Sequence, residues 1–322
     1  MLLHSFDVQY LSWKEKKLND KVSFASLVRY SRLMQVDLKE SNLWFFPEFI
    51  THADVLICIT EIDLSHNSVF YLKELMMHKF GQIRVLNLSF NLLFRIPPTI
   101  SSMKSLHTLD ISHNSLRSLP LSMRECILLT TISLGSNNFF EFPDVLLKMN
   151  LTELVIDNNL LKELPLDISA LENLSILSCC NNRLTALPPT FPELRNMTRL
   201  DTRDNLITGF SLEILRMPKI EAFTFWGNPC QYVQNIESGN LNDLPDEWRV
   251  SLPQLLAAGN PPPQKAETRQ WFCDRFFSSK KASAISEAHE QSIHFAPPIA
   301  ASDAMGFAPL HSDVNAAVAT LG

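Results

Sequence analysis

Hydrophobic and polar residues follow one short pattern that recurs along most of the chain. In one copy Leu86 and Leu88 stand between polar neighbours, which is the period-two pattern of a short strand with one buried face. Asn91 follows, and hydrophobic residues then return three apart, at Ile100 and Met103. That second spacing is typical of a helical segment packed against a core. Each copy therefore predicts a strand, a turn and a helical return.

Asparagine marks the period of this pattern. Eight asparagines, spaced by 22 to 24 residues, occupy the same place in the frame L-x-x-L-x-L-x-x-N-x-L, with Ile, Phe, Val or Met replacing some leucines. They are Asn67, Asn91, Asn114, Asn137, Asn159, Asn182, Asn205 and Asn228. A ninth, degenerate copy precedes them and has Ser41 in the asparagine position. Most copies continue with L-P-x-x-I, as in Leu119-Pro120.

This frame resembles the leucine-rich repeat family, whose period is 20 to 29 residues. The L-P-x-x-I continuation with a spacing near 23 residues is similar to the intracellular class found in Ras-pathway scaffolds and plant signalling proteins. The resemblance covers about residues 33–230. It implies an α/β fold: a leucine-rich repeat solenoid, curved like a horseshoe, with parallel strands on the concave face and short helical or 3-10 segments on the convex face.

Elementary chemistry leads to the same architecture. Nine short strands at about 4.8 Å spacing would form a parallel ladder. The sharp turn after each strand buries backbone N–H and C=O groups that need partners, and the asparagine amide supplies two donors and an acceptor. Proline then fixes the backbone where the chain leaves the turn and prepares a helical start. We therefore interpret the asparagines as a structural ladder.

The ends of the solenoid need covers, because a repeat array exposes apolar surface at both ends. The sequence predicts an N-terminal cap at residues 1–32, repeats at 33–230 and a C-terminal cap at 231–260. A linker and a short aromatic helix follow at 261–277, and we expect a disordered tail at 278–322. The aromatic helix either packs on the cap or binds a partner.

Composition removes several classes of function. The chain has 322 residues with 49 leucines but only 8 glycines, and it contains neither of the glycine-rich phosphate-binding motifs. The formal net charge of -6 gives no support to nucleic-acid binding. We find no apolar run of the roughly 20 residues that a membrane-spanning helix needs and no signal-peptide pattern. The 6 scattered cysteines favour reduced thiols in the cytoplasm.

No group of residues carries a recognisable catalytic or metal-binding motif. His66 and His113 each precede a repeat asparagine, and we expect them about 10 Å apart, too far to share a zinc ion at bonds of about 2.1 Å. Aspartates recur at one strand position, at Asp37, Asp63, Asp110 and Asp201, and we interpret them as residues of an exposed strand site. We therefore expect no catalytic residues, no metal and no cofactor.

Binding is the function that the ladder favours, because outward side chains of parallel strands share one surface. The later units depart from small polar filler residues, and a candidate partner-binding patch there consists of Asp157, Arg199, Arg203, Asp204 and Trp226. Arginine and tryptophan are common at binding hot spots. The alternative is that Trp226 packs under the C-terminal cap and Arg203 pairs with Asp201 or Asp204. A weaker second patch combines Phe90 with Val85 and Met34.

The resulting hypothesis is a non-enzymatic, cytoplasmic adaptor that is monomeric alone and binds a protein partner on its concave face. The resemblance makes signalling GTPases, kinases and phosphatase catalytic subunits plausible partners. Three alternatives stay open. One is an extracellular receptor or adhesion-type fragment, and another is a structural spacer in a cytoskeletal complex. The third is a substrate-selecting module of an enzyme, for which residues 261–322 are too short to supply a catalytic domain.

Overall fold

A computed structural model describes residues 10–12, 34–45, 59–74, 78–225, 227–229 and 232–234. All of these residues belong to one compact unit, Met1–Gln264. The predicted aromatic helix and tail, and most of the two predicted caps, lie outside the described residues. No described helix has the length and apolar character needed to cross a membrane.

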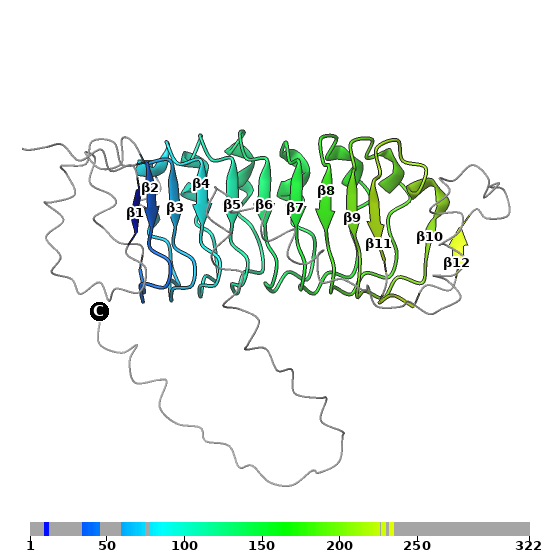
Figure 1. Ribbon diagram of the computed structural model, residues 1–322, viewed down its shortest axis with the longest axis horizontal. Coiled ribbons are helices and arrows are strands. Elements are labelled where there is room, and N and C mark those ends of the chain that lie inside the picture. Colours follow the sequence, from blue (N-terminus) through cyan, green and yellow to red (C-terminus); the bar gives the residue numbers. More distant parts are fainter. Residues whose placement is uncertain are drawn as a thin grey trace, which may run out of the picture. The chain divides into compact units, whose positions relative to one another are not determined.

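One parallel sheet of ten short strands runs the length of the described repeats (Figure 1). Each strand pairs with its neighbour in strict register, so that Ile62 lies opposite Leu86 and Leu86 opposite Leu109. The strands are β1 Tyr10–Ser12, β2 Gln35–Asp37, β3 Glu61–Asp63, β4 Val85–Asn87, β5 Thr108–Asp110, β6 Thr131–Ser133, β7 Glu153–Val155, β8 Ile176–Ser178, β9 Arg199–Asp201 and β11 Ala222–Thr224. The predicted solenoid of parallel strands is confirmed.

Two strands lie in segments that the sequence assigned to caps. β1 pairs with β2 in parallel, so the sheet has one strand more than the nine predicted from the repeats. At the other end β10, Gly209–Ser211, pairs in parallel with β12, Tyr232–Gln234, to form a separate two-stranded sheet. β1 therefore extends the repeat sheet beyond the units that the asparagine period marks, whereas β12 pairs outside that sheet.

Short 3-10 helices form the convex side of the described repeats. The segments are η3 His78–Phe80, η4 Pro98–Ser102, η5 Leu121–Glu125, η6 Asp144–Lys148, η7 Ile168–Ala170, η8 Phe191–Glu193 and η9 Leu212–Ile214. Proline starts most of them: the carbonyl of Pro97 accepts the N–H of Ile100 at 3.0 Å, and Pro120 does the same for Met123. Since a 3-10 helix has three residues per turn, residues three apart share a face, and Ile100 and Met103 are both fully buried.

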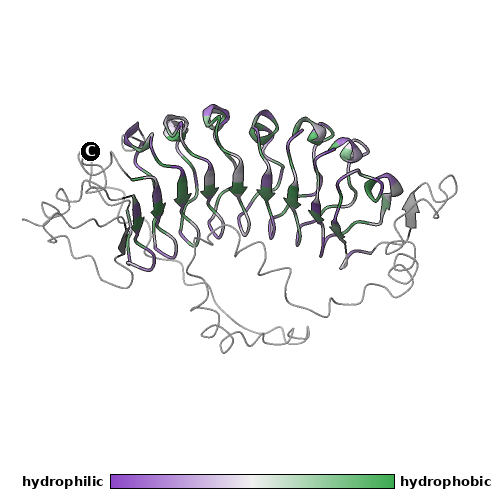
Figure 2. Ribbon diagram, turned by 45° about the horizontal axis from the view of Figure 1, so that its top comes forward, coloured by the Kyte–Doolittle hydropathy of each residue, from purple (hydrophilic) through white to green (hydrophobic). Residues whose placement is uncertain are grey.

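The core is one continuous column of side chains between the sheet and the 3-10 segments. In Figure 2 green, the colour of hydrophobic residues, recurs from strand to strand along the ladder and alternates with the purple of hydrophilic residues. Leu86, Leu109, Ile132 and Leu154 are the central residues of successive strands, and each is at most 1% exposed. Each repeat buries its apolar side chains against the next, so the solenoid lengthens without needing a single central core.

The repeat asparagines join each turn to the unit before it. Asn91 Nδ2 donates to the carbonyls of Leu88 and Ser89 in its own unit and to that of Leu64 in the preceding unit, at 2.9 to 3.1 Å. Its Oδ1 accepts the N–H of Val69 at 2.9 Å. The other seven asparagines of the ladder make the equivalent contacts. One short side chain thus satisfies several buried backbone groups.

Candidate partner-binding surface

The residue before each repeat asparagine projects from the end of its strand. Seven of them have positive φ angles between 51° and 55°: His66, Phe90, His113, Ser136, Asn158, Asn181 and Asp204. Glu40, which precedes Ser41 of the degenerate unit, has a φ of 56°. That left-handed conformation is unfavourable for a side-chain-bearing residue, and the ladder bonds hold it in place. The final unit has Gly227 there, with a φ of 75°, and the turn thus sets a column of side chains at the strand ends.

Of the strand-position aspartates, Asp110 and Asp201 are buried and Asp37 and Asp63 are half-buried, which corrects the expectation of an exposed site. Asp63 Oδ1 accepts the N–H of Ser65 at 2.8 Å, and Asp110 Oδ1 accepts that of Ser112 at 2.8 Å. Asp110 is 6% exposed. Burial raises the pKa of both carboxyls against the opposing effect of these hydrogen bonds. Asn87 lies between them and donates to Asp63 Oδ2 at 3.2 Å.

The unit of β7 breaks this arrangement and moves its carboxylate. Val155 takes the usual aspartate position, and the next unit has Ser178 there. Asp157, two residues after Val155, fills the gap: its Oδ1 accepts from the Ser178 hydroxyl at 2.6 Å and from the Cys180 N–H at 2.8 Å. Burial raises the pKa of Asp157 to about 6, and the nearby charge of Asp201 adds to this rise.

Arg203 forms a closed ion pair with Asp201 on the same strand end. Its Nε donates to Asp201 Oδ1 at 2.7 Å, and its Nη2 donates to Oδ2 at 2.5 Å. The two side chains are 8% and 3% exposed. Burial works against the charge of Arg203, but the hydrogen bonds and charge of Asp201 outweigh it and raise the pKa of the guanidinium. Arg203 is therefore a buried residue under the concave surface. Of the two interpretations of Arg203, the structure shows the one in which it pairs with Asp201.

The remaining members of the predicted patch are placed differently. Arg199 is partly exposed, with Nε 3.9 Å from Glu221 of the next unit. Asp204 is exposed, and its carboxylate lies against Gly227, where an added Cβ would come within 2.2 Å of Oδ1. Trp226 lies outside the described residues. The structure thus places the half-buried Asp157 near the buried Arg203, and leaves Asp204 exposed and Arg199 partly exposed.

Comparisons with known proteins match this geometry. A family model for the Leucine Rich Repeat matches residues 105–126. A solved internalin from Listeria monocytogenes, inlF, superposes with a TM-score of 0.55 at 16% identity, covering 70% of this chain and 62% of that one. With the repeat, the ladder and the family match in agreement, the family is established. The chain is a leucine-rich repeat protein.

Relatives of this leucine-rich repeat protein include two much longer curated proteins. Adenylate cyclase of Schizosaccharomyces pombe is 27% identical over 39% of this chain and 9% of its own length. Volume-regulated anion channel subunit LRRC8D of Rattus norvegicus is 28% identical over 53% of this chain and 20% of its own. The chain therefore spans at most a fifth of these relatives. The ectodomain of the Arabidopsis receptor kinase HAESA, solved with the peptide hormone IDA and the co-receptor SERK1, superposes at a TM-score of 0.53 with 25% identity over 62% of this chain and 35% of that one.

The thiols of the leucine-rich repeat protein are poor nucleophiles where they are described. Burial raises the pKa of Cys126 to about 11 and the pKa values of Cys179 and Cys180 further. These three cysteines are free. No group of three or more His, Cys, Asp or Glu side chains in the described part of the chain is placed to hold a metal ion.

The two repeat histidines enclose an aromatic ring. Phe90 stacks between His66 and His113, with ring centroids 4.1 and 3.8 Å apart and interplanar angles of 10°. Burial and the neighbouring His66 lower the pKa of His113. The sequence paired Phe90 with Val85 and Met34, but the ring stacks along the column of turn residues, because each of the three lies immediately before a repeat asparagine.

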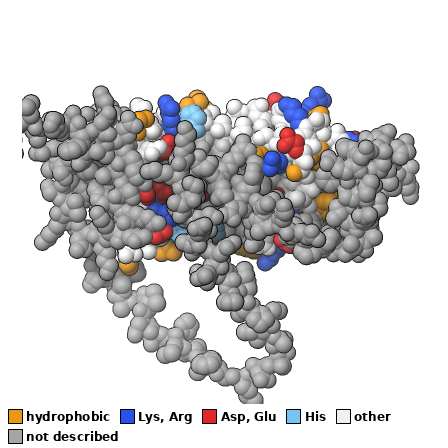
Figure 3. Space-filling model, viewed as in Figure 1, with side chains coloured by type: hydrophobic (Ala, Val, Ile, Leu, Met, Phe, Trp, Pro, Cys, Tyr) orange, Lys and Arg blue, Asp and Glu red, His pale blue; other side chains and the backbone are white. Residues whose placement is uncertain are grey.

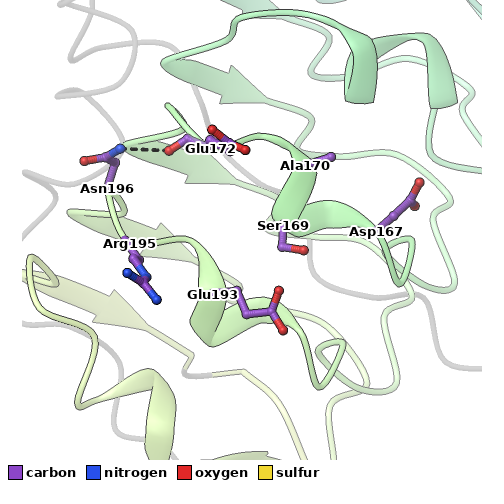
Figure 4. Close-up of a pocket in the computed structure, with 7 residues that line it drawn as sticks. All are labelled: Asp167, Ser169, Ala170, Glu172, Glu193, Arg195 and Asn196. Carbon is purple, nitrogen blue, oxygen red and sulfur yellow. Dashed lines mark hydrogen bonds between the residues drawn. The ribbon is translucent and has the colours of Figure 1, made fainter.

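A shallow groove on the convex side lies between η7 and η8 (Figure 4). Asp167, Glu172, Glu193 and Arg195 contribute its charged lining, and Asn196 Nδ2 donates to the carbonyl of Glu172 at 2.8 Å. The figure shows the carboxylates spread along the groove walls, without a common focus. This groove provides a convex reference surface for mutagenesis.

Proposed function

We propose that this leucine-rich repeat protein is a non-enzymatic scaffold or adaptor that binds a protein partner on its concave face in intracellular signalling. The observation that carries the proposal is the surface over β7 to β11. Asp157 accepts hydrogen bonds from Ser178 and Cys180 of the next unit, and Asp201 pairs with Arg203. Arg199 and Asp204 remain accessible beside them. Rigidly held, accessible charges reduce the entropic cost of association.

A partner is favoured over a small substrate by the shape of this surface. Outward side chains come from consecutive strands in one register, so they form an extended face suited to another polypeptide. The HAESA ectodomain, which is solved with a peptide hormone and a co-receptor, supports a peptide or protein as the class of ligand. The resemblance to the intracellular class supports a GTPase, a kinase or a phosphatase catalytic subunit.

The alternatives make different predictions. A receptor or adhesion-type fragment would enter the secretory pathway, whereas a structural spacer would lack a localised hot spot. The proposed adaptor requires that a few concave residues near β9 dominate the affinity, as hot-spot residues do. This requirement makes the adaptor and the spacer distinguishable by mutation.

Affinity purification from cytoplasmic extract, followed by quantitative mass spectrometry, tests the proposal. The variant Arg199→Ala/Asp204→Ala removes the accessible charges without touching the buried Arg203 pair. We expect it to lose a discrete partner by about tenfold or more. The matched control, Glu193→Ala/Arg195→Ala, removes a carboxylate and an arginine from the convex groove and is expected to retain that partner. Equal recovery with both variants would contradict the concave site.

A further inference from the structure

Large apolar side chains gather on the edge of the solenoid where the chain leaves β2, β3 and β4. From Phe90 to Phe94 every second residue faces outward: Phe90, Leu92 and Phe94 are 42%, 57% and 54% exposed. The residues between them, Asn91 and Leu93, are 6% and 0% exposed. The repeat requires particular residue types only at the buried positions. It does not explain why the exposed residues are also apolar.

The two preceding units extend this surface. Phe70 occupies the position of Phe94, three residues after the repeat asparagine, and is 38% exposed. Trp44 and Phe45 of the degenerate unit are 65% and 51% exposed, and the rings of Phe45 and Phe70 meet edge to face at 5.2 Å. We name this surface the aromatic edge: Trp44, Phe45, Phe70, Phe90, Leu92 and Phe94. Figure 3 shows orange side chains at the lower left edge, below β2 to β4.

The aromatic edge is confined to one end of the described repeats. The position of Phe94 is taken in later units by Arg117, Phe140, Lys162, Thr185 and Thr208, so polar residues replace the aromatic in four of five. Exposed apolar side chains that occur singly need no explanation, whereas a contiguous group marks an interaction site. Phe140 is a single exposed aromatic residue at its position, whereas the aromatic edge is a contiguous group.

Charge selects the kind of partner. The guanidinium of Arg95 lies 5.3 Å from the ring centre of Tyr71 and 5.7 Å from that of Phe94, and Arg117 is exposed in the next unit. The concave face of the same units instead carries carboxylates, including Asp37, Glu61 and Asp63. A ligand with apolar and acidic groups is therefore attracted to the edge and repelled by the adjoining concave face.

We propose that the aromatic edge binds an extended acidic peptide segment of a partner protein. Alternate apolar side chains of the peptide pack on Phe70, Leu92 and Phe94, and its carboxylates face Arg95 and Arg117. Period-two exposure from Phe90 to Phe94 matches the alternation of an extended ligand. This site is separate from the concave residues Arg199 and Asp204, so either site can fail without the other.

Selection from a random peptide display library tests the proposal. The purified chain serves as bait, and counter-selection uses the variant Leu92→Ser/Phe94→Ser. We expect enriched peptides to combine aromatic or aliphatic residues with Asp or Glu. By fluorescence anisotropy, Leu92→Ser/Phe94→Ser and Arg95→Gln/Arg117→Gln should each weaken a synthetic enriched peptide by about tenfold, and the arginine variant should also reduce the salt dependence.

The matched control is Leu121→Ser/Ile127→Ser, which removes two exposed apolar side chains, 73% and 70% exposed, elsewhere on the solenoid. It should bind the peptide like the unmodified chain, and thermal melts of every variant establish that it folds. Three results would overturn the proposal: enriched peptides without acidic residues, equal loss of affinity in the control, or no enrichment. Concentration-dependent self-association that Leu92→Ser/Phe94→Ser abolishes would also overturn it, because the edge would then bind a second copy of this chain.

Discussion

The carboxylate of Asp157 accepts the backbone N–H of Cys180 at 2.8 Å, across the boundary between two repeats. In the units of β3 and β5 the corresponding bond stays within one repeat, between an aspartate and the serine two residues later. The unit of β8 therefore keeps the bond but takes its carboxylate from the preceding unit, whereas in the unit of β9 the Arg203 N–H again donates to Asp201 of the same repeat. Because of this exchange, the carboxylate of the half-buried Asp157 supports the turn of the neighbouring repeat.

Asp157→Asn should change how stability depends on pH. The folded-state pKa of about 6 lies above the ordinary 3.8, so the folded protein binds the proton more tightly than the unfolded chain. The contribution of Asp157 to stability is therefore lost as pH rises from about 4 to 6, by about 3 kcal/mol for a rise of this size. Asparagine retains an acceptor oxygen and does not titrate. Urea unfolding at a series of pH values measures the difference.

The exposed Asp144, replaced by Asn, is the control for that experiment. The free energy of unfolding of Asp157→Asn, minus that of the unmodified protein, should increase between pH 4 and 6. The same measurement on Asp144→Asn controls for the removal of one carboxylate from the chain. A flat difference for Asp157→Asn would show that its carboxylate is not held in the environment described.

Arg203→Met should destabilise the fold more than it affects binding directly. The substitution leaves the carboxylate of Asp201, which is 2% exposed, buried without its cation, a loss of about 3 to 5 kcal/mol. The double variant Asp201→Asn/Arg203→Met should recover part of that loss, because no unpaired charge remains. Chemical denaturation of the two single variants and the double variant gives the coupling free energy between Asp201 and Arg203. Additive losses would contradict the closed pair.

Asn137→Ala should show how much one asparagine of the ladder contributes to the stability of the fold. Asn137 Nδ2 donates to the carbonyls of Ile111, Leu134 and Gly135, and its Oδ1 accepts the N–H of Leu116. Alanine leaves these buried groups unpaired, so we expect a loss of more than about 3 kcal/mol. The adjacent Asn138→Ala is the control and should change stability by less than about 1 kcal/mol. Thermal denaturation with equal losses in both would refute the ladder's role.

The fold was predictable because the same pattern of buried and polar residues recurs in every repeat. In one repeat the side chain of Asn91 pairs buried backbone groups, Leu86 and Leu88 are buried in the core, and the carbonyl of Pro97 accepts a hydrogen bond at the start of the 3-10 helix. Because these residue types recur at a fixed spacing, the sequence reveals the repeat. The strand β1 was missed because Tyr10–Ser12 pairs with β2 without an asparagine to mark it.

The candidate surface was less predictable because exposure depends on neighbouring units. Arginine is a residue type common at binding hot spots, but Arg203 forms a buried ion pair with Asp201, two positions earlier. The aromatic edge lies outside the strands, so the strand pattern does not predict it, although Phe70 and Phe94 share a position relative to the asparagines. The assignment of Arg199, Asp204 and Trp226 to a partner site stays a prediction.

Glycosylation distinguishes the extracellular alternative, and the structure shows which of the four Asn-x-Ser/Thr asparagines are accessible. Asn87 is 4% exposed and donates to Asp63, so a glycan there is incompatible with the fold. Asn150, Asn173 and Asn196 also precede x-Ser/Thr and are each accessible at least in part. Directed into a secretory pathway, the chain should carry glycans only among these three. Mass spectrometry after glycosidase treatment identifies the sites, and an occupied Asn87 in folded protein would contradict the buried assignment.

His113 should titrate below pH 6.5, and its neighbours should control the shift. Burial is the main cause and the charge of His66 the second, so His66→Gln should raise the pKa of His113 toward its ordinary value. Because the folded pKa is lowered, the contribution of His113 to stability is complete above 6.5 and is lost as pH falls below it. Proton NMR titration of the imidazole signals measures the pKa directly. His107→Gln, which replaces a histidine outside the stack, is the control and should leave the titration of His113 unchanged. An unshifted pKa in the unmodified protein, or one that ignores His66→Gln, would contradict the stacked arrangement of His66, Phe90 and His113.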